Sequence, residues 1–337
     1  MKDYAKIIPL PIRKLFWGTK LEVIYNRIKA EIEFMTSRTS YGLKNPDKKY
    51  YIVNNYGSWG LFSFVLLDLP QIVEADKRNL IPVIDCKNNY MEHLQNQDDA
   101  KVDNAWEYYF KQPIEWGNLD DVYNSKNVYI SKIPNSDGHN WNEIQIGDNL
   151  LCKQYKEWLK KYIVPQREIT YEVEHWLSNN VGEKKILGVS IRSGYCWVEL
   201  LKKNNAKGHP RVMECEYYLD AVERIMNDWG YDEFVLGIDD REWCDKFKEK
   251  FGKRCLVRDR HYNHLFKDGK PLKDEMEIHC EIGTSERRQM TTEYVIETYI
   301  LSHVDSLYAC RGSQGIMAYL LKDGFFKHYE FSDNGLI

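Results

Sequence analysis

The second half of the chain alternates short apolar runs with longer amphipathic segments, and this order restricts the fold more than any other feature. The runs "KKILGVSI", "DEFVLGI" and "VDSLYAC" have the length and residue types of buried strands. Between the first two lies "ECEYYLDAVERIMNDWG", which has helical spacing and ends at Gly230. "DREWCDKFKEKFG" is a second such helix and ends at Gly252. This alternation predicts a parallel sheet with helices packed on it.

The remaining segments of this half continue the order. "KRCLV" is a further strand, and a polar loop is expected over residues 258–290. "TTEYVIETYILSH" follows as a helix with a threonine as its N-cap, and "SQGIMAYLLKDG" is a helix that runs to Gly324.

The first half contains one clear βαβ unit. Residues 50–53 form a short apolar run, Gly57 and Gly60 mark a turn, and an apolar helix follows over 61–75. "LIPVID" is then a second buried strand. Such a unit also predicts parallel strands.

Two domains are expected from the length of the chain. At 337 residues it exceeds the size at which a single core is usual. A helical pattern over residues 153–180 is broken at Pro165, which marks the boundary. We therefore expect an α/β fold of two Rossmann-like, doubly wound domains, residues 1–165 and 166–337, with a ligand cleft between them.

The composition disfavours several classes of protein. A formal net charge of −4 provides no basic surface for nucleic acid. The eight cysteines form no CxxC pair and no Cys/His metal spacing, which favours reduced thiols in a cytosolic protein. With no D-x-D triplet and no HExxH pattern either, we expect no bound metal.

The chain shows no membrane-spanning pattern. No stretch is long and apolar enough for a transmembrane helix, and the first twenty residues lack a signal-peptide pattern, so we expect a cytoplasmic location. Residues 12–35 mix Lys and Arg with large apolar side chains. This segment fits an amphipathic helix packed on its own domain, and a peripheral contact with the inner face of the membrane stays open.

Cationic and amide groups gather where strands are expected to end, which is where open α/β sheets bind their ligands. Arg192 follows a buried strand, and its planar guanidinium suits a phosphate or carboxylate. Ser313 and Gln314 lie between another strand and a helix, so a hydroxyl, an amide and backbone N–H groups meet at the positive end of that helix. An anion site is expected here. A structural salt bridge for Arg192 and helix capping by Ser313 are the alternatives.

Acidic groups lie near the same ends. Asp239 and Asp240 end a third strand; one is expected to cap the next helix and the other to accept hydrogen bonds from a base or sugar hydroxyl. Glu199 follows the first strand, where a carboxylate can deprotonate a sugar hydroxyl, although a surface role is the alternative. His209 is a candidate for contact with a nucleobase or an acceptor.

Three common enzyme classes are disfavoured by their missing motifs. There is no GxGxxG after the first strand of either half, no GxxxxGK[ST] and no GxSxG. These absences argue against a nicotinamide dehydrogenase, a P-loop NTPase and an α/β-hydrolase.

A four-part pattern in the second half resembles the GDP-fucose fucosyltransferases of the α1,6 and protein O-fucosyltransferase superfamily, which includes bacterial nodulation enzymes. The parts are "GVSIR" at 188–192, "HP" at 209–210, "GIDD" at 237–240 and "ETYILSHVDSLYACRGSQ" at 297–314. In the first half, "YGSWGLFSFV" at 56–65 is similar to the glycine-rich donor loop of the family, and "WEYYF" at 106–110 to its W-E-x-x-F.

The resemblance implies a GT-B fold with a GDP-linked donor held by residues 166–337 and the acceptor by residues 1–165. It implies no cofactor besides a GDP-sugar as donor substrate. Arg192 would bind the pyrophosphate, Glu199 would act as base with a shift of one residue, and Glu297 matches an acidic family position near the donor. The other implied donor contacts are Gly57, Gly60, Ser190, His209, Asp239, Asp240, Ser313 and Gln314.

Three positions depart from the family. Ser190 stands where the family has a histidine that contacts guanine, Ser193 replaces a second arginine, and Cys196 replaces a lysine.

The resemblance thus implies an inverting, metal-independent glycosyltransferase that moves fucose from GDP-fucose to a glycan, lipid-linked glycan or glycoprotein, in polysaccharide biosynthesis. Use of another nucleotide sugar and a catalytically silent glycan-binding protein are the alternatives. Retention at the anomeric carbon is a further alternative, since Glu297 and Asp305 form an E-x7-D pattern.

Overall fold

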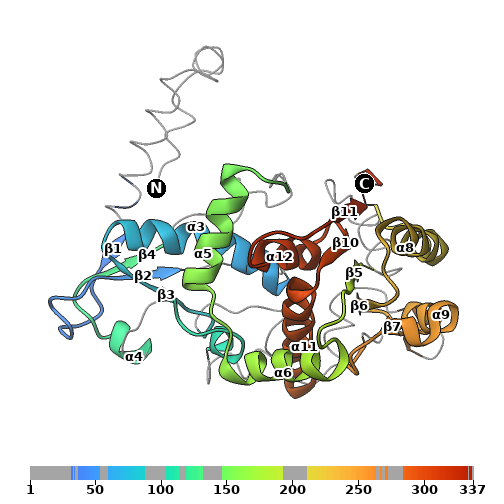
Figure 1. Ribbon diagram of the computed structural model, residues 1–337. Helices are drawn as coiled ribbons and strands as arrows, with labels where there is room; N and C mark the ends of the chain where they lie inside the picture. Colours follow the sequence, from blue (N-terminus) through green and yellow to red (C-terminus); the bar gives the residue numbers. More distant parts are fainter. Residues whose placement is uncertain are drawn as a thin grey trace, which may run out of the picture.

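The two larger β-sheets lie at opposite ends of the molecule, with helices between them (Figure 1), and β8 and β9 pair as a small third sheet. The computed structural model describes residues 32, 34, 37–53, 60–87, 104–113, 119–131, 146–192, 211–262, 266–267, 270–271, 284–332 and 334–335. The expected amphipathic segment 12–35 lies outside these residues, apart from Ile32 and Phe34. Within the described part, no helix is both long and apolar enough to cross a membrane.

The first sheet contains β1 (Arg38–Thr39), β2 (Tyr50–Val53), β3 (Ile81–Ile84) and β4 (Val128–Ile130). Its order is β1-β4-β2-β3, and β2 runs parallel to both of its neighbours. The edge strand β1 is antiparallel to β4. Helix α3 (Leu61–Lys77) connects β2 to β3, which confirms the predicted βαβ unit.

The second sheet contains β5 (Leu187–Ile191), β6 (Phe234–Ile238), β7 (Cys255–Leu256), β10 (Ser306–Cys310) and β11 (Tyr329–Ser332). Its order is β11-β10-β5-β6-β7, and every neighbouring pair is parallel. The predicted α/β architecture with parallel sheets is therefore confirmed.

The other elements are η3 (Ala105–Tyr108), α4 (Leu119–Val122), α5 (Leu150–Tyr162), α6 (Arg167–Asn180), α8 (Cys215–Trp229), α9 (Arg241–Phe251), η5 (Gly252–Arg254), β8 (Phe266–Lys267), β9 (Lys270–Pro271), α11 (Thr284–His303) and α12 (Ser313–Leu321). The predicted break at Pro165 falls between α5 and α6. Helix α8 ends, as predicted, at Gly230, whose φ of 71° lies in the left-handed region that glycine adopts without strain.

The second sheet is covered by helices on both faces. In β5, Leu187, Val189 and Ile191 join an apolar core with residues of α8 and α9. Gly188 faces the other way, and a Cβ atom there would lie 2.8 Å from the side chain of Val304, just after α11. This alternation along a buried strand is the period-two pattern of a sheet with two packed faces.

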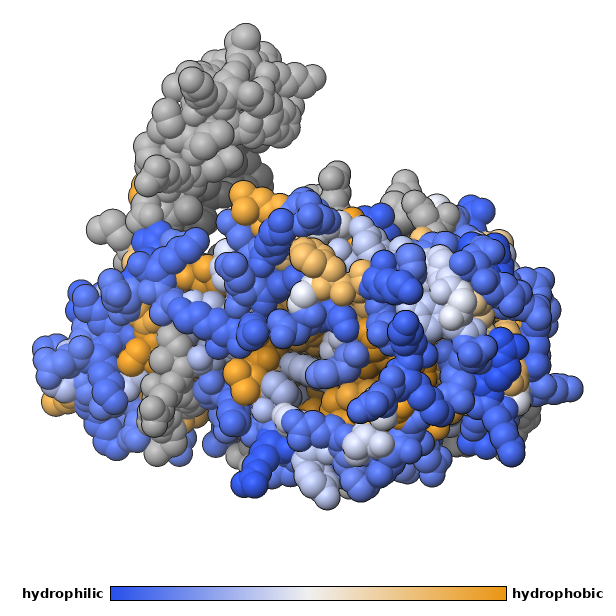
Figure 2. All heavy atoms as spheres, in the orientation of Figure 1, coloured by the Kyte–Doolittle hydropathy of each residue, from blue (hydrophilic) through white to orange (hydrophobic). Residues whose placement is uncertain are grey.

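A second apolar core joins the two halves of the chain. It contains buried residues of α3, η3, α5 and α6 together with residues of α11 and α12. Figure 2 shows a largely hydrophilic surface on this face, with hydrophobic residues visible between α5 and α11. The division into domains 1–165 and 166–337 stays a prediction.

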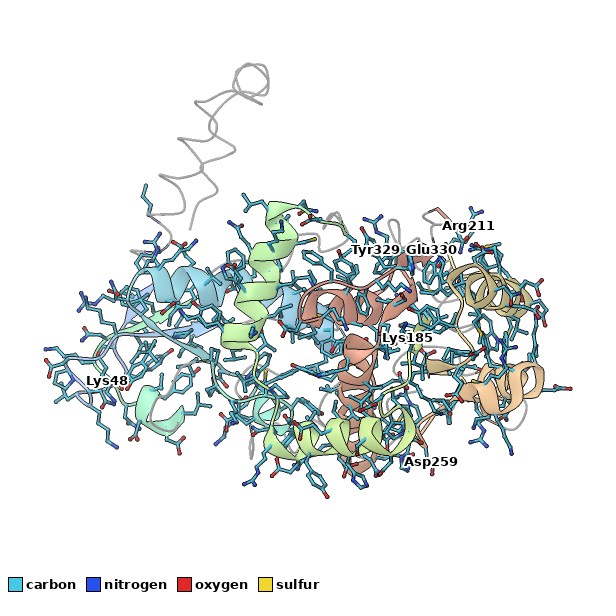
Figure 3. The ribbon with its side chains drawn as sticks, viewed as in Figure 1. Lys48, Lys185, Arg211, Asp259, Tyr329 and Glu330 are labelled. Atoms are coloured by element: carbon cyan, nitrogen blue, oxygen red, sulfur yellow. The ribbon has the colours of Figure 1, made fainter. Side chains whose placement is uncertain are left out.

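The C-terminal part of the chain returns to the second sheet. Figure 3 labels Arg211 close to Tyr329 and Glu330 of β11, and the backbone N–H of Arg211 donates to the carbonyl of Gly335 at 2.9 Å. The segment that precedes α8 is therefore held beside the end of the chain.

Two expected boundaries are wrong. Helix α12, expected to run to Gly324, ends at Leu321. Helix α11 begins at Thr284, so the expected polar loop over 258–290 ends earlier, and the expected threonine N-cap lies inside the helix. The hydroxyl of Thr292 donates to the carbonyl of Arg288 at 2.8 Å within α11. The segment "TSERRQM" is rich in good helix formers but lacks an apolar stripe, which is why its periodicity gives no helix signal.

Lys156 of α5 joins the C-terminal end of α12 to the rest of the molecule. Its Nζ donates to the carbonyls of Tyr319, Lys322 and Gly324 at 2.8, 2.9 and 3.2 Å. These carbonyls lie at the end of a helix and have no partner further along it, so the N–H groups of Lys156 satisfy them, although burial opposes the positive charge. Burial lowers the pKa of Lys156 to about 8.

We predict that Lys156→Met lowers the free energy of unfolding by roughly 2 kcal/mol, because three carbonyl oxygens lose a charged donor in a half-buried place. Lys160 is the matched control: it lies one turn along α5 and is 79% exposed in its 3.4 Å pair with Asp323. Lys160→Met should change the value by less than about 0.5 kcal/mol. Urea unfolding followed by circular dichroism measures both, and equal losses would contradict this role.

Asp68 is buried in α3 with only 2% of its surface exposed. Its Oδ1 has no hydrogen-bond partner among the described residues. Burial without a compensating cation raises the pKa of the Asp68 carboxyl well above its ordinary value. The protonated form is therefore favoured in the folded state.

A raised pKa in the folded state means that the folded protein binds more protons than the unfolded chain. The contribution of Asp68 to stability is thus lost as pH rises from the ordinary carboxyl pKa through the raised one. Asn cannot titrate, so the free energy of unfolding of Asp68→Asn should improve relative to the parent as pH increases from about 4. Urea unfolding at a series of pH values tests this, and a constant difference between the two proteins would refute it.

Candidate active site

Three neighbouring strands of the second sheet end side by side and so define the site. Because β10, β5 and β6 are parallel, Ala309, Ser190 and Gly237 are aligned across the sheet near the carboxyl ends. The residues that follow these ends include Arg192 and Asp239. Parallel pairing therefore brings together Ser190, Gly237 and Ala309, which lie far apart in the sequence, at the carboxyl ends of the strands. Sheets of this kind bind their ligands there.

Arg192 lies against the turn that precedes α12. A Cβ atom on Gly312 would lie 3.8 Å from Cδ of Arg192. Ser313, the first residue of α12, follows directly, and Gly312 is the N-cap residue and provides no side-chain cap. The side chain of Arg192 and the positive N-terminal end of α12 thus lie side by side; we call this place the Ser313 corner.

Tyr294 of α11 lines this corner, although sequence patterns did not single it out. Its Oη lies 3.4 Å from Oγ of Ser313. Burial raises the pKa of Tyr294 to about 12, and the hydrogen bond with Ser313 and the positive charge of Arg192 oppose that rise. Its ring centroid lies 5.1 Å from that of Phe62, so the first turn of α3 also reaches this corner. The one feature of the sequence that could have indicated Tyr294 is its position three residues before Glu297, because residues at this spacing lie on the same face of a helix.

A chain of buried polar groups supports the strand ends. Oγ of Ser190 donates to Oε1 of Gln314 at 2.9 Å, and Nε2 of Gln314 donates to Oε1 of Glu297 at 2.7 Å. Nη1 of Arg260 donates to both carboxylate oxygens of Glu297, at 3.1 and 3.2 Å. The same Nη1 lies 3.2 Å from the carbonyl of Ile238 at the end of β6. One chain of contacts therefore connects β5, β6, α11 and α12.

The ion pair in this chain is almost completely buried. The side chains of Arg260 and Glu297 are 5% and 3% exposed. Burial raises the pKa of Glu297, while the charge of Arg260 and the hydrogen bond from Gln314 oppose the rise. For Arg260, burial alone would lower the pKa, but the charges of Glu297 and Asp239 raise it overall. Arg260 was also missed by sequence patterns, because it lies in the segment expected to be a polar loop.

The two adjacent aspartates have different surroundings. Asp240 is the N-cap of α9, and its side chain accepts a hydrogen bond from the backbone N–H of Trp243 at 2.9 Å. This confirms that one of the pair caps the helix. The negative charge of Asp239 contributes to raising the pKa of both Arg260 and Tyr294, so it acts on both side chains electrostatically.

A second acidic contact holds the segment after β7 on α11. The backbone N–H of His261 donates to Oε2 of Glu293 at 2.7 Å, and its Nδ1 lies 3.0 Å from Oε1. Glu293 and Glu297 lie one turn apart on α11. Arg260 and His261 are thus fixed to the same helix by two carboxylates.

Three expected site residues cannot be placed, and a fourth, Gly60, has no described contact with the site. Gly57, Glu199 and His209 lie outside the described residues. Gly60 is the N-cap residue of α3, and a Cβ atom there would meet nothing within 4 Å.

The E-x7-D pair does not form one site. Oδ2 of Asp305 accepts the backbone N–H of Ile186 at 2.7 Å, at the amino ends of β5 and β10. Glu297 lies near Gly237, toward the carboxyl end of β6. The two carboxylates therefore lie at opposite edges of the sheet.

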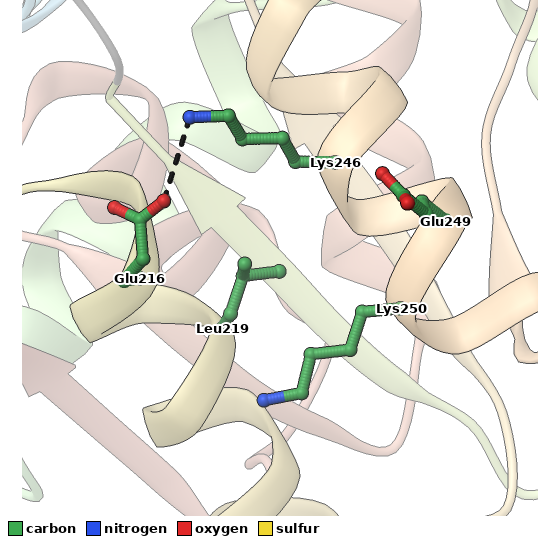
Figure 4. Close-up of a pocket in the computed structure, with 5 residues that line it drawn as sticks. All are labelled: Glu216, Leu219, Lys246, Glu249 and Lys250. Atoms are coloured by element: carbon green, nitrogen blue, oxygen red, sulfur yellow. Dashed lines mark hydrogen bonds and ion pairs between the residues drawn. The ribbon is translucent and has the colours of Figure 1, made fainter.

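A groove of about 400 Å³ lies between α8 and α9 (Figure 4). Lys246 and Lys250 line it, and both form ion pairs, at 3.4 Å with Glu216 and at 2.9 Å with Glu223. Its charged groups serve to join two surface helices. Within the described ranges, no three His, Cys, Asp or Glu side chains gather to hold a metal ion, and independence of metal stays a prediction.

Gly237 leaves space for the buried ion pair, because a Cβ atom there would lie 2.9 Å from Cδ1 of Leu301 and 3.0 Å from Oε1 of Glu297. We predict that Gly237→Ala lowers the free energy of unfolding by about 1–3 kcal/mol through overpacking. Gly60→Ala, whose Cβ meets no neighbour, should cost less than about 1 kcal/mol. Urea unfolding measures both, and a harmless Gly237→Ala would show that Glu297 is not confined as described.

No protein-family model matches the sequence, and the curated proteins give no match. Solved structures do give matches. NodZ alpha-1,6-fucosyltransferase soaked with GDP-fucose is 14% identical, with a TM-score of 0.44 over 86% of this chain and 98% of its own. POFUT1 in complex with GDP-fucose is 10% identical, with a TM-score of 0.47 over 86% and 99%. Fucosyltransferase NodZ from Bradyrhizobium is 14% identical, with a TM-score of 0.40 over 81% and 93%. Because these identities and TM-scores are low, the function of this chain has to be inferred from its own residues.

Proposed function

We propose that this protein is a glycosyltransferase that uses a nucleotide sugar, with fucose from GDP-fucose as the donor group. The observation that carries the proposal is the position of Arg192 beside the N-terminal turn of α12, at the adjoining carboxyl ends of β5 and β10. A guanidinium and a helix N-terminus both favour a negatively charged ligand, and a diphosphate can contact the two together.

The chemistry of glycosyl transfer fits these groups. As the bond between the sugar and the diphosphate breaks, negative charge grows on the leaving oxygen and positive charge on the anomeric carbon. Groups fixed in advance around the leaving oxygen lower the barrier, because they need not reorganise during the reaction. Arg192 and the backbone N–H groups at Ser313 and Gln314 are proposed to have this role.

Some of the remaining residues are proposed to contact the donor, and others to hold those residues in position. We propose that Ser313, Gln314 and Asp239 bind the donor directly. Asp240 is proposed to cap the N-terminus of α9 and so to hold the neighbouring Asp239 in place. Glu297 already accepts hydrogen bonds from Arg260 and Gln314, so we assign it to support instead of direct contact. We also propose that Glu199 is the base that deprotonates the acceptor hydroxyl. Further donor contacts are proposed for Gly57, Gly60, Ser190 and His209.

The finer parts of the proposal come from the sequence resemblance. They are a GT-B arrangement with the acceptor on residues 1–165 and the donor on 166–337, inversion at the anomeric carbon, and no metal or other cofactor. The proposed acceptor is a glycan, lipid-linked glycan or glycoprotein in polysaccharide biosynthesis, at a cytoplasmic location with peripheral membrane contact left open.

Another nucleotide sugar is the second candidate donor, and one contact favours it. Ser190, at the position of the guanine-contacting histidine in the fucosyltransferases, donates its hydroxyl hydrogen to Gln314. Recognition of guanine by an imidazole is therefore absent at this position. Thermal unfolding with GDP and UDP at equal concentrations distinguishes the two, because a nucleotide that binds the folded state raises the midpoint.

We predict that Arg192→Met lowers the rate of GDP release from GDP-fucose by about 10²–10³-fold, the usual effect of removing one preorganised charge-stabilising group. Arg254→Met is the matched control, since Arg254 donates to the carbonyl of Asp232 near the amino end of β6, away from the proposed site. Chromatographic assay of GDP, with and without acceptor glycans, measures the rates.

Both variants should keep the circular dichroism spectrum and unfolding midpoint of the parent. A folded Arg192→Met protein with the parent's rate would remove Arg192 from the mechanism. A parent protein that releases no nucleotide from any nucleotide sugar would favour the catalytically silent glycan-binding alternative.

A further inference from the structure

We propose that Arg260 is a positioning residue that, through Glu297, fixes the direction of the hydrogen bonds of Gln314 and Ser190 at the strand ends. This inference rests on the proposed function, because it concerns the same site. It assigns a role to a residue outside the sequence pattern that defines the site.

The first step is the shared oxygen. Oε1 of Glu297 accepts from Nη1 of Arg260 at 3.1 Å and from Nε2 of Gln314 at 2.7 Å. Any displacement of the carboxylate therefore moves the acceptor of Gln314. The pair cannot relax into solvent, because both charged side chains are at most 5% exposed.

The second step is the orientation of the amide. An ionised carboxylate has no hydrogen to donate, so it faces the Nε2 side of Gln314, and Oε1 of Gln314 is turned toward Ser190. The hydroxyl hydrogen of Ser190 is then directed to Gln314, at 2.9 Å. Oγ of Ser190 consequently offers only lone pairs to a ligand, so it suits an N–H or O–H group of a donor and not a phosphate oxygen.

The third step is the charge of Glu297. A carboxylate buried without a cation takes up a proton, and burial does raise the pKa of Glu297. The charge of Arg260 opposes this, because its Nη1 contacts both carboxylate oxygens. Without Arg260, a protonated Glu297 can donate to Gln314, and the amide can turn over so that its Nε2 faces Ser190. Ser190 would then accept from Gln314 and direct its hydroxyl hydrogen to a ligand.

The first experiment observes Gln314 without any ligand. In protein labelled with ¹⁵N-glutamine, the side-chain NH₂ signals of Gln314 are identified by their loss in Gln314→Met. In the parent, we expect one protected hydrogen. In Arg260→Met, hydrogen exchange at this position should become about tenfold faster, as expected for the loss of roughly one hydrogen bond.

Arg258→Met is the matched control. Arg258 lies two residues away in the same segment and is 3.9 Å from Glu172 on α6. It should leave the Gln314 signals unchanged. Arg260→Lys should restore part of the protection, because an ammonium supplies the charge without the planar fork. Unchanged Gln314 signals in a folded Arg260→Met protein would overturn the proposal.

The second experiment measures the consequence for the site. Calorimetric titration with GDP should show a dissociation constant about tenfold higher for Arg260→Met than for the parent and Arg258→Met. With GDP-fucose, KM should rise more than kcat falls, in contrast to Arg192→Met, where kcat falls. A parent that does not bind GDP would contradict the proposed donor, while the exchange experiment would still decide the role of Arg260.

A double variant separates positioning from stability. Removing Arg260 alone leaves a buried carboxylate without its cation, which is costly, whereas Arg260→Met with Glu297→Gln leaves no unpaired charge. We expect the double variant to fold and still bind GDP more weakly than the parent. Affinity equal to that of the parent would show that the ion pair has no part in organising the site.

Discussion

The parallel pairing of β5 with β10 and β6 is the constraint on which the site depends. It places the segments after Ile191, Ile238 and Cys310 at one edge of the sheet, although they lie far apart in the sequence. Arg192, Asp239 and Ser313 each follow one of these strands, and Tyr294 and Glu297 lie on α11, which packs against them. A parallel sheet buried on both faces also fixes those ends rigidly, since its strands cannot shift without exposing one apolar core or the other.

Helix α11 links this edge of the sheet to the other half of the chain. Glu293, Tyr294 and Glu297 lie on it within five residues, and they contact His261, Ser313 and Arg260. The same helix contributes to the apolar core shared with α3 and α5. Movement of the first half against the second would therefore act directly on the polar groups of the site.

Sequence patterns predicted the regular parts of this structure well, because buried strands and glycine-ended helices have strong local signals. Gly230 and Pro165 mark their boundaries as expected. The start of α11 was missed, since its first turns have helix-forming residues but no apolar stripe. Arg260 and Tyr294 were missed for a different reason: their roles arise from tertiary contacts with residues distant in the sequence, which no local pattern contains.

The proposed positions of Arg192 and Ser313 had a physical basis in the sequence, namely a cation and a helix start after two strands. Their partners come only from the packed structure.

A crystal structure of the protein with GDP tests the central claim most directly. The account predicts the diphosphate within hydrogen-bond distance of the Arg192 guanidinium and the backbone N–H groups at Ser313 and Gln314. A nucleotide bound elsewhere on the chain, or none at saturating concentration, would contradict it.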